Sequence, residues 1–328
     1  MIISKTPYRI SFFGGGTDLN SWLNNGNEGL ILSTSINKYC YITLRDLPKI
    51  FNFKYRLRYY INEEANNIKN IKHNSIRECL NLLKFQNQPL ELVHHGELPS
   101  QSGLGSSSTF TVGLIKSLYE FKKQKISKRK LCQKAIFIEQ DILKESVGKQ
   151  DHIAAAYGGF NIISMQNQKF RVKKLNNNKI IKKIENNIIL LFTSLQRNSE
   201  PLEKKKSSKI FKGEKNDELN NILNITKEAI LEINSENFSL QKFGKLLSEN
   251  WKYKKMLHKN VTNSNIDEMY EKVMSLGAYG GKLLGSGNGG FFLFVCPTHK
   301  TKQIENIFKS KLIKNIKFDL EGSHIIYS

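Results

Sequence analysis

The chain has 328 residues, enough for one large domain or two of ordinary size. Hydrophobic residues make up 39% of it and aromatic residues 10%, so a sizeable core can form and a wholly disordered chain is excluded. No apolar run approaches the roughly 18–20 residues that span a bilayer. The N-terminal stretch "MIISKTPYRI" is too short and polar for a signal peptide. We therefore expect a cytoplasmic protein with no membrane partner.

The formal net charge of +22 first suggests a nucleic-acid-binding protein. The lysines are spread along the chain, however, and "KKK" at 204–206 is their densest run. Abundant Lys, Asn and Ile together are typical of an AT-rich genome, and no aromatic residues alternate with the basic ones. We therefore expect no specific nucleic-acid partner, and a charge that attracts phosphorylated substrates.

The cysteines are scattered and form no CxxC pair, which predicts buried, reduced thiols and no zinc site. Trp251 lies in an amphipathic helical pattern and is expected in the core rather than on a substrate wall. The four cysteines are Cys40, Cys79, Cys132 and Cys296.

In the first half of the chain, the pattern predicts a mixed sheet with helices packed on it. Residues 168–186 are polar and rich in Asn, which indicates either a hairpin turn or a domain boundary. We expect strands at 2–13, 30–45, 54–61 and 90–95, helices at 74–85, 106–122 and 128–146, and strands again at 158–165 and 187–193.

The second half is mainly helical by pattern. Strands and helices mix without strict alternation, so we predict an α+β protein of two domains, residues 1–185 and 186–328. The expected elements are helices at 217–234, 238–258 and 264–276, a strand–glycine loop–strand unit at 282–297, a helix at 299–313 and a closing pair of strands.

Three glycine-rich stretches each lie beside a β-prone segment. They are "GGGTDL" at 14–19, "SGLGSSST" at 102–109 and "GSGNGG" at 285–290. One such stretch is weak evidence, because many turns need a glycine with positive φ. Three of them indicate backbone that is brought close to a ligand.

The second stretch is typical of a phosphate-binding loop. A helix N-terminus leaves backbone N–H groups unpaired and carries partial positive charge, which favours phosphate. Ser106, Ser107 and Ser108 can cap the helix or offer a hydroxyl to phosphate or Mg²⁺, and the length of the run argues against a simple serine cap. The stretch has neither the Walker pattern nor the dinucleotide fingerprint.

Phosphoryl transfer needs a carboxylate for Mg²⁺ and profits from a base at the acceptor hydroxyl. Glu139 lies mid-helix among apolar residues in "AIFIEQDIL", although an ordinary exposed helix acid is the alternative interpretation. Asp151 lies in an expected glycine-containing loop, "VGKQDHIAAAYGG". His152 is an alternative base, but a single histidine in a loop is more often merely polar.

In this order and spacing, the three stretches resemble the motifs of the GHMP kinase superfamily, which includes galactokinase and the homoserine, mevalonate and phosphomevalonate kinases. "PSQSGLGSSST" is similar to its phosphate loop, "TPYRISFFGGGTDL" to its N-terminal substrate motif and "KLLGSGNGG" to its C-terminal glycine motif. Ser286 and Asn288 depart from the small residues of the common form, but both tolerate tight turns. The resemblance implies a fold with an N-terminal domain like ribosomal protein S5 domain 2 and a C-terminal ferredoxin-like α/β sandwich.

Within the superfamily, "GGGTD", "ESVGKQD" and "ENWKYKKML" resemble most the D-glycero-D-manno-heptose 7-phosphate kinase group. Those enzymes phosphorylate the anomeric hydroxyl of a sugar phosphate, toward GDP-heptose and surface polysaccharide. Fucokinase domains, which act on an unphosphorylated sugar, are the nearest rival. A non-catalytic sugar- or nucleotide-sensing protein is the alternative from another class, and the retention of Glu139 and Asp151 argues against it.

The resemblance implies ATP and Mg²⁺ as cofactors, and a monomer or homodimer as the state of the protein. Asp151 would accept the proton of the attacking hydroxyl, Arg9 would stabilise charge beside it, and Glu139 with the Ser107 hydroxyl would hold Mg²⁺. The residues that would enclose the ATP phosphates are Pro99, Gly103, Leu104, Gly105, Ser106, Ser107 and Ser108. Those that would hold the substrate or close the site over it are Gly15, Gly16, Thr17, Asp18, Lys149, Arg197, Gly285, Gly287 and Gly289, with Lys282 as a further candidate.

Overall fold

The computed structural model of the chain describes residues 1–166, 169–194 and 200–328. Within these residues the protein is α+β, with one sheet of eight strands and one of four, as expected from the pattern. The larger sheet runs in the order β12–β1–β2–β5–β3–β4. In addition, β6 pairs with β2, and β7 pairs with β6. Its strands are β1 (Ile2–Phe13), β2 (Gly29–Asp46), β3 (Tyr55–Arg58), β4 (Asn62–Ala65), β5 (Leu90–Gly96), β6 (Phe160–Gln166), β7 (Lys169–Lys174) and β12 (His324–Tyr327).

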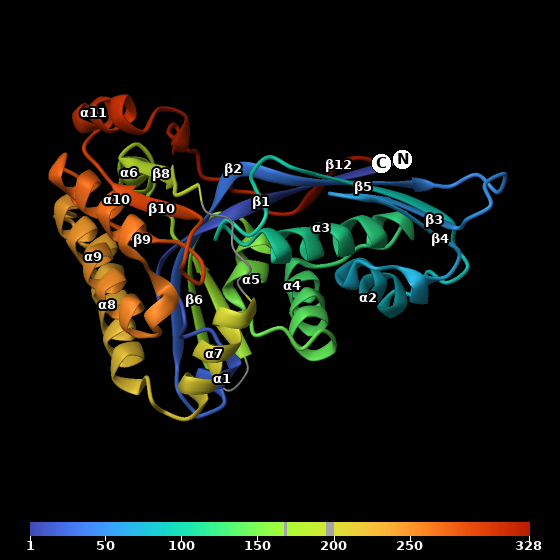
Figure 1. The fold of residues 1–328 in the computed structure, drawn as a ribbon, viewed down its shortest axis with the longest axis horizontal. Coiled ribbons are helices and arrows are strands. Elements are labelled where there is room, and N and C mark those ends of the chain that lie inside the picture. Colours follow the sequence, from blue (N-terminus) through green and yellow to red (C-terminus); the bar gives the residue numbers. More distant parts are fainter. Residues whose placement is uncertain (167–168, 195–199) are drawn as a thin grey trace.

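Helices cover one face of the larger sheet (Figure 1). α3 packs directly on β1 and β2, and its apolar residues, among them Val112, Leu114 and Ile115, are fully buried. Successive side chains of a strand point to opposite faces, so Arg9 and Ser11 of β1 share one face, from which Arg9 reaches Asp151, and Tyr8 and Ile10 are buried on the other. The helices on this face are α2 (Asn74–Leu82), α3 (Ser106–Phe121), α4 (Lys128–Ile136) and α5 (Gln150–Tyr157).

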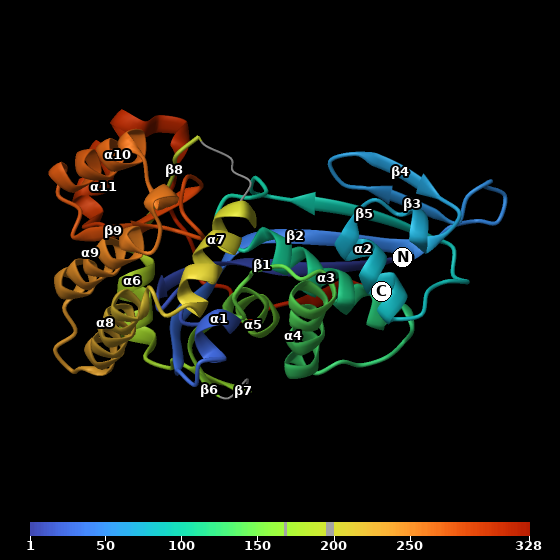
Figure 2. The same cartoon turned by 60° about the horizontal axis from the view of Figure 1, so that its bottom comes forward.

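The smaller sheet belongs to the second half of the chain and runs in the order β11–β8–β10–β9. Helix α9 packs on β9 and on α8, and α8 in turn contacts β1 and β2 of the larger sheet (Figures 1 and 2). The elements are β8 (Ile188–Phe192), β9 (Gly280–Leu283), β10 (Phe291–Val295), β11 (Leu312–Ile313), α8 (Asn216–Asn234), α9 (Leu240–Met256), α10 (Ser264–Ser275) and α11 (Thr298–Phe308). Three further helices are α1 (Asn20–Leu23), α6 (Asn178–Glu185) and α7 (Glu200–Phe211).

The two ends of the chain lie side by side (Figures 1 and 2). β12 pairs antiparallel with β1, with Ile3 opposite Tyr327. The predicted division at residue 185 falls at the end of α6, just before the first strand of the smaller sheet. However, β12 comes after that division in the sequence and yet belongs to the larger sheet. The position of the domain boundary therefore stays a prediction.

The structure differs from the sequence expectation at several elements. Residues 54–61 were expected as one strand, but β3 ends at Arg58 and a turn leads into β4. The helix expected at 128–146 ends at Ile136, and residues Phe137–Ile142 form a π-helix. The helix expected at 299–313 ends at Phe308, and β11 lies at the end of that range. The closing strands are not a pair, because β11 joins the smaller sheet and β12, the strand after residue 313 in the described ranges, joins the larger one. Helices α6 and α7 were not predicted.

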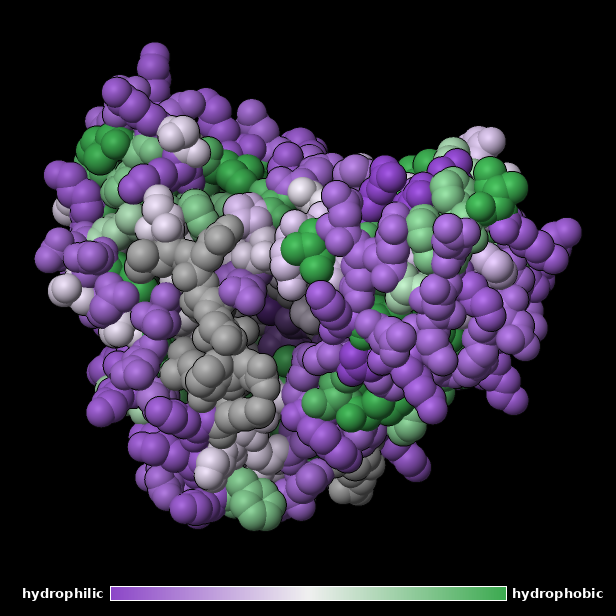
Figure 3. Space-filling view, turned by 45° about the vertical axis from the view of Figure 1, so that its right-hand side comes forward, coloured by the Kyte–Doolittle hydropathy of each residue, from purple (hydrophilic) through white to green (hydrophobic). Residues whose placement is uncertain are grey.

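One face of the molecule is largely polar. The face in Figure 3 is mostly hydrophilic, with hydrophobic residues in small separate groups. All four cysteines are free and buried, and Trp251 is 1% exposed, as predicted. In the described ranges, no helix combines the length and the apolar character that crossing a bilayer requires.

Candidate active site

The three glycine-rich stretches converge on one cavity of about 180 Å³. Five segments of the chain line it: parts of residues 9–19, 101–108, 147–151, 254–257 and 282–286. The first three come from the half of the chain before residue 185, and the last two come from the C-terminal end of α9 and from β9 with the loop after it. The cavity therefore brings together segments that lie far apart in the sequence.

The second stretch leads into an uncapped helix N-terminus. Gly105 is the N-cap of α3 with φ +77°, and no side chain accepts a hydrogen bond from the first turn. Ser106, Ser107 and Ser108 begin the helix and line the cavity. The unpaired N–H groups of this turn, together with the helix dipole, form an anion-binding site.

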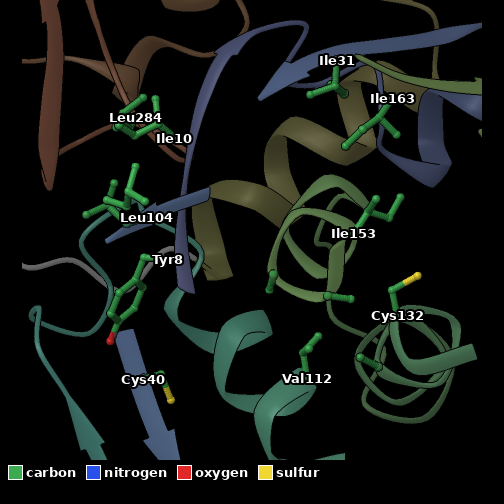
Figure 4. Close-up of a cluster of buried hydrophobic side chains, with 14 of the residues drawn as sticks. Tyr8, Ile10, Ile31, Cys40, Leu104, Val112, Cys132, Ile153, Ile163 and Leu284 are labelled. Atoms are coloured by element: carbon green, nitrogen blue, oxygen red, sulfur yellow. The ribbon is translucent and has the colours of Figure 1, made fainter. Parts of the chain in front are cut away.

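Leu104 anchors this loop in the interior. Its carbonyl accepts a hydrogen bond from the Arg9 N–H at 3.2 Å, and its side chain is fully buried close to Ile10 and Leu284 (Figure 4). Gly103, with φ +84°, approaches the C-terminal half so closely that a Cβ there would lie 2.7 Å from the Leu284 carbonyl oxygen. Glycine is therefore required at this position both by the backbone conformation and by the close approach.

Arg9 and Asp151 form a two-point ion pair on the cavity wall. The Arg9 Nε donates to Asp151 Oδ1 at 2.8 Å and Nη2 donates to Oδ2 at 2.9 Å. The remaining Arg9 nitrogen, Nη1, donates to the Gly103 carbonyl at 2.6 Å. The Asp151 side chain keeps 22% of its surface exposed, whereas that of Arg9 keeps 5%. Arg9 thus links the carboxylate to the phosphate-binding loop and leaves the carboxylate open to the cavity.

Asp151 does not lie in a loop, as the sequence suggested, but in the first turn of α5. The small residues that follow, Ala154–Ala156, are fully buried, which lets the helix pack tightly into the core. A glycine at 105 is needed opposite it, because a Cβ there would lie 3.2 Å from Asp151 Oδ2. The helix therefore fixes the carboxylate within reach of the loop.

Glu139 is fully buried behind the serines of the phosphate loop, not an exposed helix acid. It accepts hydrogen bonds from Ser107 at 3.3 Å, Ser108 at 2.9 Å and Thr111 at 2.7 Å, and it contacts His152 Nε2 at 2.8 Å. Burial alone would raise the pKa of Glu139, but His152 and the hydroxyl donors lower it. The carboxylate is therefore held ionised.

His152 is not a polar loop residue. It is fully buried in α5, and its side chain contacts Glu139. It therefore does not point into the cavity, where the alternative base would have to lie. Burial alone would lower the pKa of His152, but the Glu139 carboxylate raises it. The pair therefore joins α5 to the π-helix and holds Glu139 in place.

Asp18 ties the first glycine-rich stretch to the start of α5. Its Oδ1 accepts the Gly16 N–H at 3.1 Å and its Oδ2 accepts the Gln150 N–H at 3.2 Å. Burial, and secondly the charge of Asp151, raise the pKa of Asp18. Gly15, Gly16 and Asp18 line the cavity, as expected of substrate-binding residues.

Thr17 lies beneath the first stretch and is fully buried. Its hydroxyl donates to the Gly14 carbonyl at 2.8 Å and accepts the Leu30 N–H at 3.1 Å. These bonds fix the shape of the loop, and a role of Thr17 toward a substrate stays a prediction. Lys149 is also buried, and burial lowers its pKa.

The third stretch closes the cavity from the C-terminal half. Gly285 and Ser286 line the cavity, whereas Gly287 packs so tightly on Val261 that a Cβ would lie 2.7 Å from its backbone. Gly289 is buried in the same loop. The loop is bonded to the phosphate loop, since the Phe291 N–H donates to the Ser102 carbonyl at 2.9 Å.

Pro99 and Arg197 are the remaining residues of the predicted site. Pro99 lies half-buried in the segment between β5 and α3, before the part of the loop that lines the cavity. Arg197 lies outside the described residues. Its expected contact with the substrate therefore stays a prediction.

Sequence reasoning missed several residues that line the cavity. Ser11 and Gln150 are 5% and 7% exposed, and Ser11 Oγ and Gln150 Oε1 have no hydrogen-bond partner in the part of the chain that the structure describes. The Ser286 hydroxyl is also buried and has no hydrogen-bond partner among the described residues. Ser11 could have been found, because it shares a strand face with Arg9, and Gln150 directly precedes Asp151. Lys254, on α9, lies in the quoted segment "ENWKYKKML", but nothing in that segment distinguishes it from the neighbouring lysines.

The residues around the phosphate loop fit an ATP phosphate tail and Mg²⁺. The first turn of α3 is uncapped, and side chains at Gly103 or Gly105 would fill the cradle beside it. The Ser107 hydroxyl lines the cavity with Glu139 directly behind it. Mg²⁺ in such sites takes most of its ligands from phosphate and water and only one or two from the protein. Ser107 and Glu139 suit that need.

Comparison with known proteins agrees with this geometry. The chain is 29% identical to the D-glycero-alpha-D-manno-heptose 7-phosphate kinase of Campylobacter jejuni, over 98% of this chain and 97% of that protein. It is 22% identical to the bifunctional fucokinase/GDP-fucose pyrophosphorylase of Arabidopsis thaliana, over 97% of this chain and 32% of that protein. The crystal structure of a D-glycero-D-manno-heptose 1-phosphate kinase from Bacteroides thetaiotaomicron superposes with a TM-score of 0.76, at 22% identity and full coverage of both chains.

Two family descriptions match separate parts of the chain. "GHMP kinases N terminal domain" matches residues 74–159, which contain the phosphate loop, Glu139 and Asp151. "GHMP kinases C terminal" matches residues 216–314, which contain the third glycine-rich stretch. The two matches together cover more than half of the sequence and contain four of the five segments that line the cavity, all but residues 9–19. The chain belongs to the GHMP kinase family and has its two-domain fold.

Proposed function

We propose that this GHMP kinase transfers the γ-phosphoryl group of ATP to the anomeric hydroxyl of a sugar phosphate, namely D-glycero-α-D-manno-heptose 7-phosphate. The product would be the 1,7-bisphosphate, on the route to GDP-heptose and surface polysaccharide. The observation that carries the proposal is the Arg9–Asp151 pair, held open to the cavity beside the uncapped N-terminus of α3. The 29% identity to a heptose 7-phosphate kinase supports the choice of sugar.

The reaction forms a bond between the anomeric oxygen and the γ-phosphorus and breaks the bond from that phosphorus to the β–γ bridging oxygen, which leaves on ADP. The amides of the Gly103–Ser108 loop would bind the phosphate tail, and Ser107 and Glu139 would hold Mg²⁺, which would supply neutralisation of the phosphate charge. Arg9 adds a fixed cation beside the group that moves. The acceptor proton goes to Asp151, whose carboxylate remains partly exposed in the cavity.

Unpartnered polar groups in the cavity support a substrate rich in hydroxyl groups. Ser11 Oγ, Gln150 Oε1 and Ser286 Oγ are buried without a hydrogen-bond partner, which costs about 1–3 kcal/mol for each group. A sugar can satisfy all three, because each of its hydroxyls both donates and accepts. Asp18 offers a further acceptor on the same wall.

The acceptor can be identified with a panel of sugars in a coupled assay for ADP release, followed by NMR of the product. We expect turnover of the heptose 7-phosphate, with the new phosphate on the anomeric carbon. Turnover of free sugars alone would favour the fucokinase-like alternative, which the relative from Arabidopsis supports. Absence of ATP turnover with every sugar would favour a non-catalytic sensing protein. A cytoplasmic location and a monomeric or homodimeric state stay predictions.

A further inference from the structure

Two lysines from the C-terminal half of the chain line the cavity. Lys282 of β9 is 2% exposed and Lys254 of α9 is 6% exposed. Lysine is among the residues least often buried in proteins, because its ammonium group loses solvation. Two buried lysines therefore give this small cavity a positive charge that an anionic ligand would offset.

Among the described residues, the hydrogen-bond acceptors of Lys282 are neutral. Its Nζ donates to the Phe12 carbonyl at 2.9 Å and to Asn250 Oδ1 at 3.0 Å, and both acceptors are neutral. An ammonium group has three N–H donors, so one remains beyond these two. Burial, and secondly the charge of Arg9, lower the pKa of Lys282 to about 7, while Asp18 offsets this in part. An added anion would relieve the cost of burying this charge.

Lys254 stands next to the same corner of the cavity. Its Nζ donates to the carbonyl of Leu283, the residue directly after Lys282, at 2.5 Å. The same ammonium group lies 5.6 Å from the centre of the Trp251 ring. The two lysines thus approach the cavity from a helix and from a strand that are packed together.

Lys282 contacts β1 at the Phe12 carbonyl, three residues beyond Arg9, so it lies away from the reacting end of the site. Arg9, Ser11 and the Phe12 carbonyl follow one another on β1, and three residues of extended strand span about 10 Å. A sugar with its anomeric oxygen at Asp151 would place its ring near Ser11. The substituent at the far end of a seven-carbon sugar would then lie toward Lys282.

We propose that Lys282 and Lys254 form an anion subsite that binds the phosphate group which the sugar substrate already carries. This inference rests on the proposed function and deepens it, because it selects sugar phosphates over free sugars. The phosphate tail of ATP is the other possible source of the anion. The loop amides and Arg9 already serve that tail, so we assign the lysines to the sugar.

The test compares one sugar with and without its phosphate. Lys282→Met and Lys254→Met remove the charges and keep the side-chain length, and Lys252→Met, at an exposed position of the same helix, is the matched control. For each protein, kcat/KM is measured with D-glycero-D-manno-heptose 7-phosphate, with the unphosphorylated heptose, and for ATP. We expect each cavity variant to lower the preference for the phosphorylated sugar by about 10–100-fold, the scale of one charged hydrogen bond. The control should keep the wild-type ratio, and the KM for ATP should change little.

Other outcomes would overturn the subsite while leaving the kinase intact. An equal loss with both sugars would give the lysines a merely structural role, and a raised KM for ATP with an unchanged sugar ratio would assign them to the nucleotide. If Lys282→Met does not fold, Lys254→Met decides alone.

If the wild-type protein phosphorylates neither heptose, the proposed function fails, and the subsite is judged by calorimetry with D-mannose 6-phosphate and D-mannose. Tighter binding of the phosphate ester that Lys254→Met abolishes would support the subsite. Equal binding of the two probes, or binding of neither, would overturn it as well.

Discussion

The Arg9 guanidinium and the Asp151 carboxylate, 142 residues apart in the sequence, meet through two parallel hydrogen bonds. A planar guanidinium fork fixes the plane of a carboxylate as well as its position. Because Arg9 also donates to the Gly103 carbonyl, the same side chain sets the distance between the carboxylate and the phosphate loop. Three predictions concern this arrangement.

Asp151→Asn should lower kcat by roughly 10²–10⁴-fold and leave ATP binding nearly unchanged, because the amide keeps the shape of the side chain but cannot accept the proton. Steady-state kinetics and equilibrium titration with ATP measure the two effects. Asp141→Asn, at an exposed position of the π-helix, is the control. Unaltered turnover in the Asp151 variant would remove this residue from the mechanism.

Arg9→Lys should lower kcat by about 10²–10³-fold, although it keeps the charge. A lysine ammonium cannot bridge both carboxylate oxygens and the Gly103 carbonyl in one plane, so the carboxylate would lose its fixed orientation. The measurement is kcat at saturating ATP and sugar. Wild-type kcat in this variant would show that charge alone suffices.

Gly105→Ala should reduce activity more than its effect on folding explains. Gly105 has φ +77°, and an added Cβ would lie 3.2 Å from Asp151 Oδ2. Gly26→Ala is a matched control, because Gly26 has φ +81° and nothing within 4 Å of a new Cβ. Both variants should lose about 1–2 kcal/mol of stability from the left-handed backbone. Only Gly105→Ala should lose kcat, and equal kinetics of the two would contradict the argument.

His152→Ala should destabilise the protein by about 3–5 kcal/mol, because it leaves the Glu139 carboxylate buried without its charged partner. His152→Gln keeps a donor near the position of Nε2 and should lose less. Urea unfolding of both variants at one pH measures the difference. Equal stability of His152→Ala and the wild-type protein would mean that the contact between His152 and Glu139 does not stabilise the fold.

The stability of the protein should rise with pH above about 7 because of Lys282. Its folded-state pKa, about 7, lies below the ordinary lysine value of 10.5, so between these values the unfolded chain holds a proton that the folded chain has released. Stability therefore increases with pH in that window, by at most about 1.4 kcal/mol per pH unit for one proton. Below it, Lys282 is charged in both states and the slope vanishes.

The measurement is the difference in unfolding free energy between the wild-type protein and Lys282→Met, taken from pH 6 to 10. Groups other than Lys282, including Arg9 and Asp18, are common to both proteins, so their titration largely cancels. A difference that does not change with pH would show that Lys282 keeps an ordinary pKa.

Local patterns in the sequence predicted the parts of the site that depend on backbone geometry. Alternation predicted β1 over residues 2–13, and the Gly-Ser run before an apolar segment predicted the N-terminus of α3 at Ser106. These features are recognisable because a phosphate-binding turn needs positive φ at particular residues. Arg9 was identified only by resemblance to a family, whereas Asp151 was a candidate from its own segment and the resemblance gave it the role of base.

Tertiary contacts determine what the sequence did not predict. Asp151 and His152 read as loop residues, because a short helix of small residues has no distinct apolar stripe, and its partners lie in other elements. The burial of Glu139 depends on the π-helix, for which no local pattern exists. Ser11 and Gln150 became candidates only when the fold showed that their polar atoms are buried and unpartnered.

The pairing of β12 with β1 also constrains how the chain is made. Residues 324–327 are synthesised long after β1, so the first strand of the larger sheet cannot acquire this outer neighbour until they have left the ribosome. Deletion of residues 324–327 should therefore expose an unpaired edge beside Ile3 and Lys5, with the attendant tendency to aggregate.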